Sequence, residues 1–174
     1  MIEVSVAGLG IAPPSSSPLL LLKEREGERV LPIGIGPLEA QAIAMPLQGI
    51  KPPRPMTHDV FVDVISNLGG HLRRVEIVEL TDNTFHARLV LDQAGKEQRI
   101  DIRPSDAIAL AVRTETPIFV AESVLEQAAV LPQESVPATD DVSLDESKLS
   151  PFKEFIETLD IDDLGQGGGG EPRP

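Results

Sequence analysis

The sequence predicts an α+β fold, in which a mixed, mostly antiparallel sheet is combined with three to five short helices. Short apolar segments that alternate with polar residues occur in two groups, and helical patterns follow each group. Proline and glycine mark the borders between these segments. Neither a Gly-x-Gly-x-x-Gly loop nor a Walker A loop is present. A regular βαβ winding is therefore not expected.

The first group of strands is expected near the N-terminus, at residues 1–12, 19–23 and 29–35. Each segment alternates or concentrates apolar residues over strand length, and the charged stretch around Gly27 is typical of a hairpin connection. Pro37 then begins a helix that runs to about Gly49. Pro46 should end or kink this helix, because proline cannot donate the backbone hydrogen bond that a helix interior requires.

The second group starts with a helix for which Thr57 is the expected N-cap and Gly69 the end. This helix carries one apolar stripe, formed by Val60, Phe61, Val64, Ile65 and Leu68. Three strands, a helix, a short strand and a last helix should follow, at 72–80, 84–91, 97–103, 104–114, 117–120 and 122–129. The turns between the three strands are expected at Asp82-Asn83 and at residues 93–95. The helix at 104–114 should be deeply buried, because its centre is apolar on all sides.

Composition divides the chain into a folded part and an acidic end. We expect a globular domain at 1–131, an acidic linker at 132–147, a short helix at 148–164 and a disordered tail at 165–174. The formal net charge is −13, and residues 131–174 contribute 3 basic and 11 acidic side chains to it. The N-terminus does not resemble a signal peptide, and no apolar run is long enough to cross a membrane. A cytoplasmic protein is expected.

Several classes of function are disfavoured by composition. Cysteine is absent, which excludes disulfides and thiolate metal sites. Tryptophan and tyrosine are also absent, which argues against a surface that stacks single-stranded bases. The acidic balance argues against loose, non-specific binding of nucleic acid. A local basic patch is still conceivable among Lys51, Arg54, Arg73, Arg74, Arg103 and Arg113.

The segment Lys51–Asp59 is the first candidate site. Its prolines hold the chain extended, so Arg54 is carried on a stiff tether that runs into a helix start. Backbone N–H groups at such a start attract anions, and an imidazole such as His58 can act as a general base near neutral pH. We therefore interpret His58, Asp59 and Arg54 as catalytic candidates, and Lys51, Thr57 and again Arg54 as substrate-binding candidates. The alternative is that His58 only anchors its loop.

The segment Ile100–Asp106 is the second candidate. Strand alternation puts Asp101 and Arg103 on one face, after which Pro104 begins a helix with Ser105 and Asp106 in its first turn. Arg103 and Asp101 are interpreted as catalytic candidates, and Ser105 as a substrate-binding one. A purely structural role of Asp106 at the helix start is the alternative, because carboxylates are stabilised there by about 0.3–1 kcal/mol.

A divalent metal site is a further hypothesis. Hard cations such as Mg²⁺ and Mn²⁺ prefer carboxylate oxygens, which Glu39, Asp59, Asp101 and Asp106 would supply. Of these, Glu39, Asp59 and Asp106 are the proposed ligands. The spacing itself is not a metal signature, since no His-Glu-x-x-His or EF-hand pattern is present.

Five ordered blocks of the sequence resemble the bifunctional nuclease domain family. They are Leu31-Pro32-Ile33-Gly34-Ile35-Gly36, Pro53-Arg54-Pro55-Met56-Thr57-His58-Asp59, Asp82-Asn83-Thr84-Phe85, Arg103-Pro104-Ser105-Asp106-Ala107-Ile108 and Pro117-Ile118-Phe119-Val120. The resemblance implies a fold peculiar to that family, cleavage of DNA and RNA, and a homo-oligomer, for which a dimer is favoured. It extends over the whole chain except the last ten residues.

Two hypotheses of function follow. In the first, the protein hydrolyses phosphodiester bonds, with His58 as base, Arg54 and Arg103 as phosphate clamps, and the acidic residues as metal ligands or orienting groups. In the second, it is a non-catalytic regulatory module that binds an anionic ligand or a protein partner at the same place. The resemblance favours the nuclease.

Overall fold

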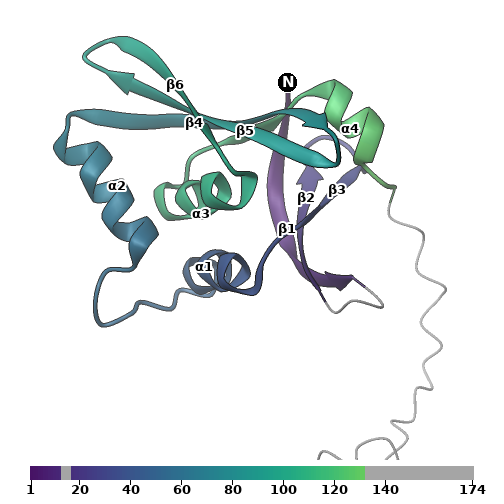
Figure 1. The fold of residues 1–174 in the computed structure, drawn as a ribbon, viewed down its shortest axis with the longest axis horizontal. Coiled ribbons are helices and arrows are strands. Elements are labelled where there is room, and N and C mark those ends of the chain that lie inside the picture. Colours follow the sequence, from purple (N-terminus) through teal and green to yellow (C-terminus); the bar gives the residue numbers. More distant parts are fainter. Residues whose placement is uncertain (13–16, 132–174) are drawn as a thin grey trace, which may run out of the picture. The chain divides into compact units, whose positions relative to one another are not determined.

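The computed structural model describes residues 1–12 and 17–131, and within them it has seven strands and four helices (Figure 1). The strands are β1 (Ile2–Ala12), β2 (Ser17–Glu24), β3 (Val30–Gly34), β4 (Gly70–Thr81), β5 (Thr84–Gln93), β6 (Lys96–Ile102) and β7 (Ile118–Val120). The helices are α1 (Pro37–Leu47), α2 (Thr57–Asn67), α3 (Pro104–Thr114) and α4 (Glu122–Ala128). The predicted α+β class is confirmed. The expected linker, C-terminal helix and tail lie outside the described residues.

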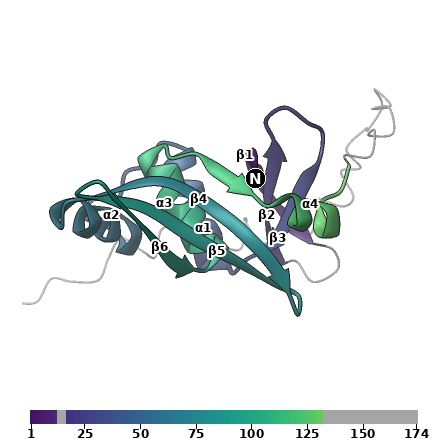
Figure 2. The same ribbon diagram turned by 90° about the horizontal axis from the view of Figure 1, so that it is seen from above.

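The strands form one sheet in the order β3-β2-β1-β7-β4-β5-β6. Neighbouring strands are antiparallel except β7 and β4, which are parallel. The short strand β7 therefore connects two three-stranded groups, β1–β3 and β4–β6, and Figure 2 shows it running between them. Its three residues pair with Ile2–Val4 on one side and with Val75–Ile77 on the other.

The two hairpins of the β4–β6 group turn where the sequence predicts. Asp82 and Asn83 both have positive φ, 49° and 61°, as the two central residues of a type I′ turn require. Ala94 and Gly95 occupy the corresponding positions of the next hairpin, with φ of 51° and 75°. Alanine is an unusual choice there, because its Cβ makes the left-handed conformation unfavourable.

The core lies between the sheet and the helices, with α1, α2 and α3 on the same side of β4–β6 (Figure 1). The centre of α3, Ala107–Ala111, is completely enclosed, as its all-round apolar sequence predicts. Helix α1 contains Pro46 and ends one residue later, in agreement with the expected stop. At the edge of the sheet formed by β3, Val30 pairs with Val130 in an isolated bridge.

Helix α2 begins one residue earlier than expected, and much of its apolar stripe is exposed. Its N-cap is Met56, so Thr57 is the first helical residue and not the cap. Its apolar stripe is also largely open to solvent: the exposed fractions of Val60, Phe61 and Val64 are 47%, 39% and 45%. The helix is held to the core by the partly buried Ile65, which belongs to this stripe, and by Val62 beside it. A stripe on a helix indicates an apolar face, but it does not tell whether the same chain covers that face.

Within residues 1–12 and 17–131, no helix has both the length and the apolar character needed to cross a membrane.

Candidate functional site

The two candidate segments of the sequence meet at the starts of α2 and α3. His58 lies in the first turn of α2 and Asp106 in the first turn of α3, and the imidazole Nε2 is 3.3 Å from the Asp106 carboxylate. Arg103, the N-cap residue of α3, donates from Nε to the other oxygen of Asp106 at 2.6 Å and from Nη2 to the first at 3.0 Å. One carboxylate thus holds both the imidazole and the guanidinium.

Glu39, in the first turn of α1, completes this group, because Arg103 also donates from Nη1 to its Oε1 at 3.1 Å. We refer to His58, Asp106, Arg103 and Glu39 as the His58–Asp106 cluster. The side chain of Arg103 is 65% exposed and that of His58 is 19% exposed. The guanidinium is therefore free to exchange one of its carboxylate partners for a ligand, whereas the imidazole is held more firmly.

The charge of Asp106 is maintained by its partners. Partial burial raises the pKa of this carboxyl, but the hydrogen bonds from Arg103 and His58 lower it more, so the pKa lies below its usual range. Asp106 is consequently an anion at neutral pH. A carboxylate that accepts a hydrogen bond from an imidazole fixes the orientation of the ring and stabilises its protonated form.

His58 and Asp106 also line an apolar hollow of about 410 Å³. The other lining residues are Thr57, Val60, Phe61, Val64 and Ile102. The hollow therefore combines the exposed stripe of α2 with the end of β6. A polar pair beside an apolar recess is a common composition of ligand sites.

Asp59 is the sequence neighbour of His58 but has different partners. Its carboxylate accepts the Met56 N–H at 2.7 Å, which satisfies one free donor of the helix start, and the Nε of Arg113 at 2.6 Å. These two hydrogen bonds, the first above all, lower the pKa of Asp59 against the opposing effect of burial. The contacts of Asp59 are those of a helix cap and a structural anchor.

Arg113 is a residue whose importance sequence reasoning missed. It is only 10% exposed, and besides binding Asp59 it donates from Nη1 to the carbonyls of Ala42 and Ala109, each at 2.8 Å. One guanidinium thereby joins α1, α2 and α3. The available signal was a single arginine in the last turn of a helix whose other residues are mostly apolar, where a charge needs a buried partner.

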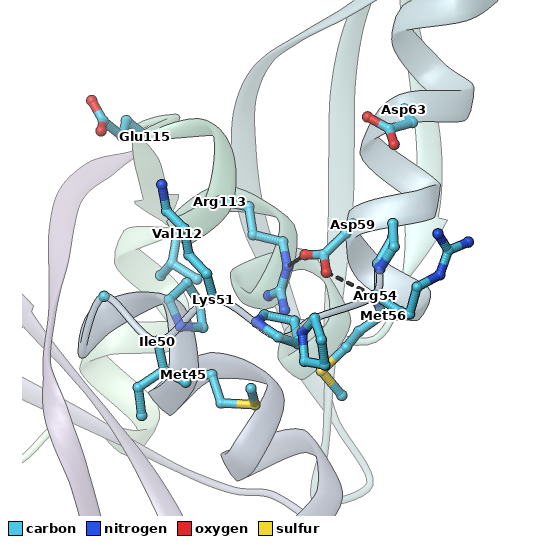
Figure 3. Close-up of a pocket in the computed structure, with 15 residues that line it drawn as sticks. Met45, Ile50, Lys51, Arg54, Met56, Asp59, Asp63, Val112, Arg113 and Glu115 are labelled. Carbon is cyan, nitrogen blue, oxygen red and sulfur yellow. Dashed lines mark hydrogen bonds and ion pairs between the residues drawn. The ribbon is translucent and has the colours of Figure 1, made fainter.

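Lys51 and Arg54 lie in a separate groove of about 650 Å³ (Figure 3), which Asp59 and Arg113 also line. Among the described residues, neither Lys51 nor Arg54 has an ion-pair partner. Figure 3 shows the guanidinium of Arg54 extending away from the Arg113–Asp59 pair. The four other arginines of the suspected basic patch, Arg73, Arg74, Arg103 and Arg113, are neutralised by carboxylates.

The remaining candidates are placed as follows. Thr57 lines the hollow together with His58. Ser105 is buried in the first turn of α3. Asp101 stands opposite Arg88 of β5, and its neighbours Ile100 and Ile102 stand opposite the buried Leu89 and Ala87. Because side chains alternate along a strand, Asp101 faces the outer side of the sheet, away from α3.

The proposed metal ligands do not gather at one point. Within the described part of the chain, no group of three or more His, Cys, Asp or Glu side chains is arranged to hold a metal ion. Asp59 binds Met56 and Arg113, while Glu39 and Asp106 are bridged by Arg103. The residues present therefore do not fit a preformed cation site, and we derive no chemical step through a metal.

The fold and this cluster define an α+β domain with a candidate polar site between helix starts, and the chain is similar in sequence to several known proteins. The chain is 43% identical over 162 residues to "Uncharacterized protein Rv1829" of Mycobacterium tuberculosis, a match that covers 93% of this chain and 97% of that protein. It is 28% identical over 131 residues to "Bifunctional nuclease 1" of Oryza sativa subsp. japonica, covering 73% of this chain and 40% of the rice protein. "Bifunctional nuclease 1" of Arabidopsis thaliana is 28% identical over 107 residues, covering 59% of this chain and 33% of that protein.

Residues 20–133 match the bifunctional nuclease domain. The chain belongs to this family, as the five sequence blocks predict. It spans about two fifths of the rice protein and one third of the Arabidopsis protein, so only a part of each plant protein corresponds to it.

Proposed function

We propose that this protein is a nuclease that hydrolyses phosphodiester bonds of DNA and RNA, with the His58–Asp106 cluster as its active site. The observation that carries the proposal is the single Asp106 carboxylate shared by His58 and Arg103 at a solvent-accessible hollow. Membership of the bifunctional nuclease domain family and the names of the plant relatives support it. The cluster supplies the two groups that hydrolysis of a phosphodiester needs, a base and a cation.

In this proposal, His58 is the general base. It takes a proton from the attacking water while the water oxygen forms a bond to phosphorus, and the bond from phosphorus to the leaving sugar oxygen breaks. The proton is then returned to the leaving oxygen. Asp106 is a positioning residue, which orients the imidazole through Nε2.

Arg103 is assigned to the phosphate. Its exposed guanidinium has two carboxylate partners, and turning from Glu39 to a phosphate oxygen would retain the bond to Asp106. Charge developing on the phosphate in the transition state would strengthen that contact. Lys51 and Arg54 have no ion pair among the described residues, and we assign them to the phosphates that flank the cleaved bond in the nucleic acid. Thr57 is assigned to binding substrate in the hollow.

A requirement for Mg²⁺ or Mn²⁺ stays a prediction, because Glu39 and Asp106 would have to release Arg103 before binding a cation. Activity measured with each cation and with a chelator tests it.

The deciding experiment compares plasmid nicking and RNA cleavage by the full chain and by His58→Ala, purified in parallel. Removal of a general base should reduce the rate at least roughly a hundredfold. The matched control is His86→Ala, since His86 is an exposed histidine on β5 outside the cluster and should leave the rate unchanged. Equal nicking by all three proteins would indicate a contaminating enzyme and defeat the proposal.

A second candidate is a non-catalytic module that binds an anion or a protein. The exposed stripe of α2 beside the cluster favours it, because a solvent-exposed apolar patch next to polar groups is typical of interaction sites. Thermal stabilisation by nucleotides or inorganic phosphate without turnover, lost in Arg103→Met, would support this module over the nuclease.

A further inference from the structure

Phe61 is the one exposed phenylalanine of the described residues. Its exposed fraction is 39%, whereas Phe85 and Phe119 are partly buried. Phe61 also lines the apolar hollow that contains His58. An aromatic ring open to water beside a candidate active site indicates a contact with a ligand, because leaving so much apolar surface exposed is unfavourable.

The ring of Phe61 stands one helical turn after the imidazole. Residues three positions apart lie on the same side of a helix, and helical side chains lean toward the N-terminus. Phe61 therefore leans toward the turn that carries Thr57 and His58, and all three residues line the hollow. Ile102, at the end of β6, lines it from another element. The hollow thus has an aromatic wall and an aliphatic wall next to the polar pair.

The phosphate of a bound strand would lie next to this hollow. Arg103 Nη2 and His58 Nε2 approach the same oxygen of Asp106, at 3.0 and 3.3 Å. One carboxylate oxygen therefore separates the proposed phosphate clamp from the proposed base. A nucleotide that brings its phosphate to Arg103 carries a sugar and a base only a few bonds away, so both lie within reach of the hollow.

The hollow is suited to a single base. Its volume of about 410 Å³ lies within the usual range of small-molecule sites, roughly 300–1,000 Å³. Among the described residues that line it, the polar ones are Thr57, His58 and Asp106, and the proposed reaction already uses the last two. Only the Thr57 hydroxyl is left to read the edge of a base. Every base, however, has a π-face that can stack on a phenylalanine.

We propose that the hollow is a nucleobase subsite, in which the base of an unpaired nucleotide stacks on Phe61 while its phosphate contacts Arg103. The inference rests on the proposed nuclease function, from which it takes the position of the phosphate, and it specifies the substrate class. The preferred substrate is single-stranded RNA or DNA, or an unpaired nucleotide within a duplex. Phe61 is the specificity-determining residue, and Ile102 contacts the other face of the base.

A paired base cannot enter the hollow without leaving its stack. In a duplex both faces of a base contact neighbouring bases, so the Phe61 ring can reach only an extruded nucleotide. Extrusion costs pairing and stacking energy, which is least where the base is already unpaired. The enzyme consequently selects unpaired structure and not a sequence, with purines favoured modestly because their larger rings stack more strongly.

The composition of the chain agrees with a subsite for one base and not for a row of bases. A platform for a long single strand uses several aromatic side chains in succession. Tryptophan and tyrosine are absent from the sequence, and Phe61 is the single exposed phenylalanine in the described part of the chain. These observations argue against an extended stacking surface but are compatible with one stacked base.

The test measures cleavage of three RNA substrates of one sequence: the single strand, the perfect duplex, and a duplex with one unpaired nucleotide. The wild type should cut the single strand at least roughly a hundredfold faster than the perfect duplex, because extrusion adds to the barrier. In the third substrate, cleavage should fall at the unpaired nucleotide. The same set made of DNA should give the same order.

Variants of Phe61 identify the stacking contact. Phe61→Leu keeps an apolar side chain but removes the ring, and it should slow cleavage of the single strand by roughly tenfold or more. Phe61→Tyr keeps the ring and should stay within about threefold of the wild type. Leu68→Ala is the control that should leave the rate unchanged, since Leu68 is an exposed apolar residue at the end of α2 that does not line the hollow. Circular dichroism verifies that each variant folds.

An abasic strand separates stacking from any other role of Phe61. The bond beside an abasic position should be cut roughly tenfold or more slowly than the same bond in the intact strand, because no base fills the hollow. In Phe61→Leu the abasic and the intact strand should be cut at rates within about threefold of each other, since the stacking contact is already missing.

Binding measured without turnover distinguishes the subsite from the nuclease. The probes are adenosine 5′-monophosphate and ribose 5-phosphate, followed by nuclear magnetic resonance of the methyl groups of Val60 and Val64, which line the hollow. The wild type should bind the nucleotide at least roughly tenfold more tightly than the sugar phosphate, and Phe61→Leu should bind both alike. This binding result without cleavage of any strand would support the subsite and reject the nuclease.

Three results would overturn the subsite, whether or not the protein is a nuclease. The wild type could cut the single strand and the perfect duplex at equal rates. Phe61→Leu could behave like the wild type with both intact and abasic strands. The nucleotide could bind no more tightly than the sugar phosphate, including the case in which neither binds.

Discussion

The guanidinium of Arg113 lies 2.6 Å from the carboxylate of Asp59 and joins three helices through its further bonds to Ala42 and Ala109. The residues of this pair stand 54 positions apart in the chain. Because His58 immediately precedes Asp59, the pair also fixes the helix start that carries the candidate base. The position of His58 thus depends on the Arg113–Asp59 contact, which lies outside the His58–Asp106 cluster.

Replacing Arg113 should destabilise the protein strongly. Arg113→Met removes the guanidinium donor from Asp59 and from two backbone carbonyls, and we expect the free energy of unfolding to fall by about 2–4 kcal/mol. Urea denaturation measures it. Arg73→Met is the control, because the Arg73–Asp92 pair is exposed and should change stability by no more than about 0.5 kcal/mol. Equal effects of the two variants would contradict the structural role of Arg113.

The contribution of Asp59 to stability should depend on pH. The pKa of this carboxyl is lower in the folded protein than in the unfolded chain, so its contribution is present above the unfolded value of about 4. It is lost as the pH falls through the lower, folded value. Asp59→Asn should therefore be less stable than the wild type at pH 7, and the difference should shrink on acidification below about pH 4.

Urea unfolding of both proteins at several pH values gives this difference directly. The other carboxylates titrate in both proteins and cancel in the comparison. A difference that stays constant down to the acid limit would show that the Asp59 charge is not what stabilises the helix start.

The turn between β5 and β6 can be improved. Ala94 has a φ of 51°, which glycine adopts without steric cost, so Ala94→Gly should raise the free energy of unfolding by about 0.5–1 kcal/mol. Ala44→Gly is the control: Ala44 lies inside helix α1 and has no positive φ, so glycine should destabilise there by a similar amount. Thermal melts show whether each variant is more or less stable than the wild type. A loss of stability in Ala94→Gly would contradict the turn geometry.

Asp106→Asn tests the shared carboxylate. The substitution removes the carboxylate that orients both His58 and Arg103, so the nuclease proposal predicts a loss in kcat of roughly a hundredfold with a smaller change in KM. Asp82→Asn, in the exposed turn between β4 and β5, is the control, because Asp82 lines neither the groove nor the hollow. A variant with normal kcat but a changed pH profile of binding would favour an anion-binding module instead.

Much of the fold could be predicted because short local sequences determine where its helices begin and where its strands turn. Pro37 and Pro104 begin helices where proline is favoured, and Asp82-Asn83 tolerates the positive φ of its turn. The burial of α3 follows from an apolar surface on all sides. Each of these features depends on a few consecutive residues, and so a single sequence is sufficient to recognise it.

The site was less predictable, because it depends on how the helices cross. His58 and Asp59 are adjacent, yet one contacts the first turn of α3 and the other its last turn. Which neighbour reaches which end is decided by the position of α2 relative to α3, a tertiary relationship. The exposure of the α2 stripe and the place of β7 between β1 and β4 are likewise set by residues far away in the chain.

The location of β7 has a consequence for biosynthesis. Until residues 118–120 leave the ribosome, the strands made earlier can form only two separate three-stranded sheets, and β1 and β4 each keep a bare inner side. Three residues near the end of the domain close both sides at once. A nascent chain that stalls or is cleaved before these residues would expose unpaired strand edges, which promote aggregation. Strand β7, which is made late in synthesis, therefore protects the domain against aggregation.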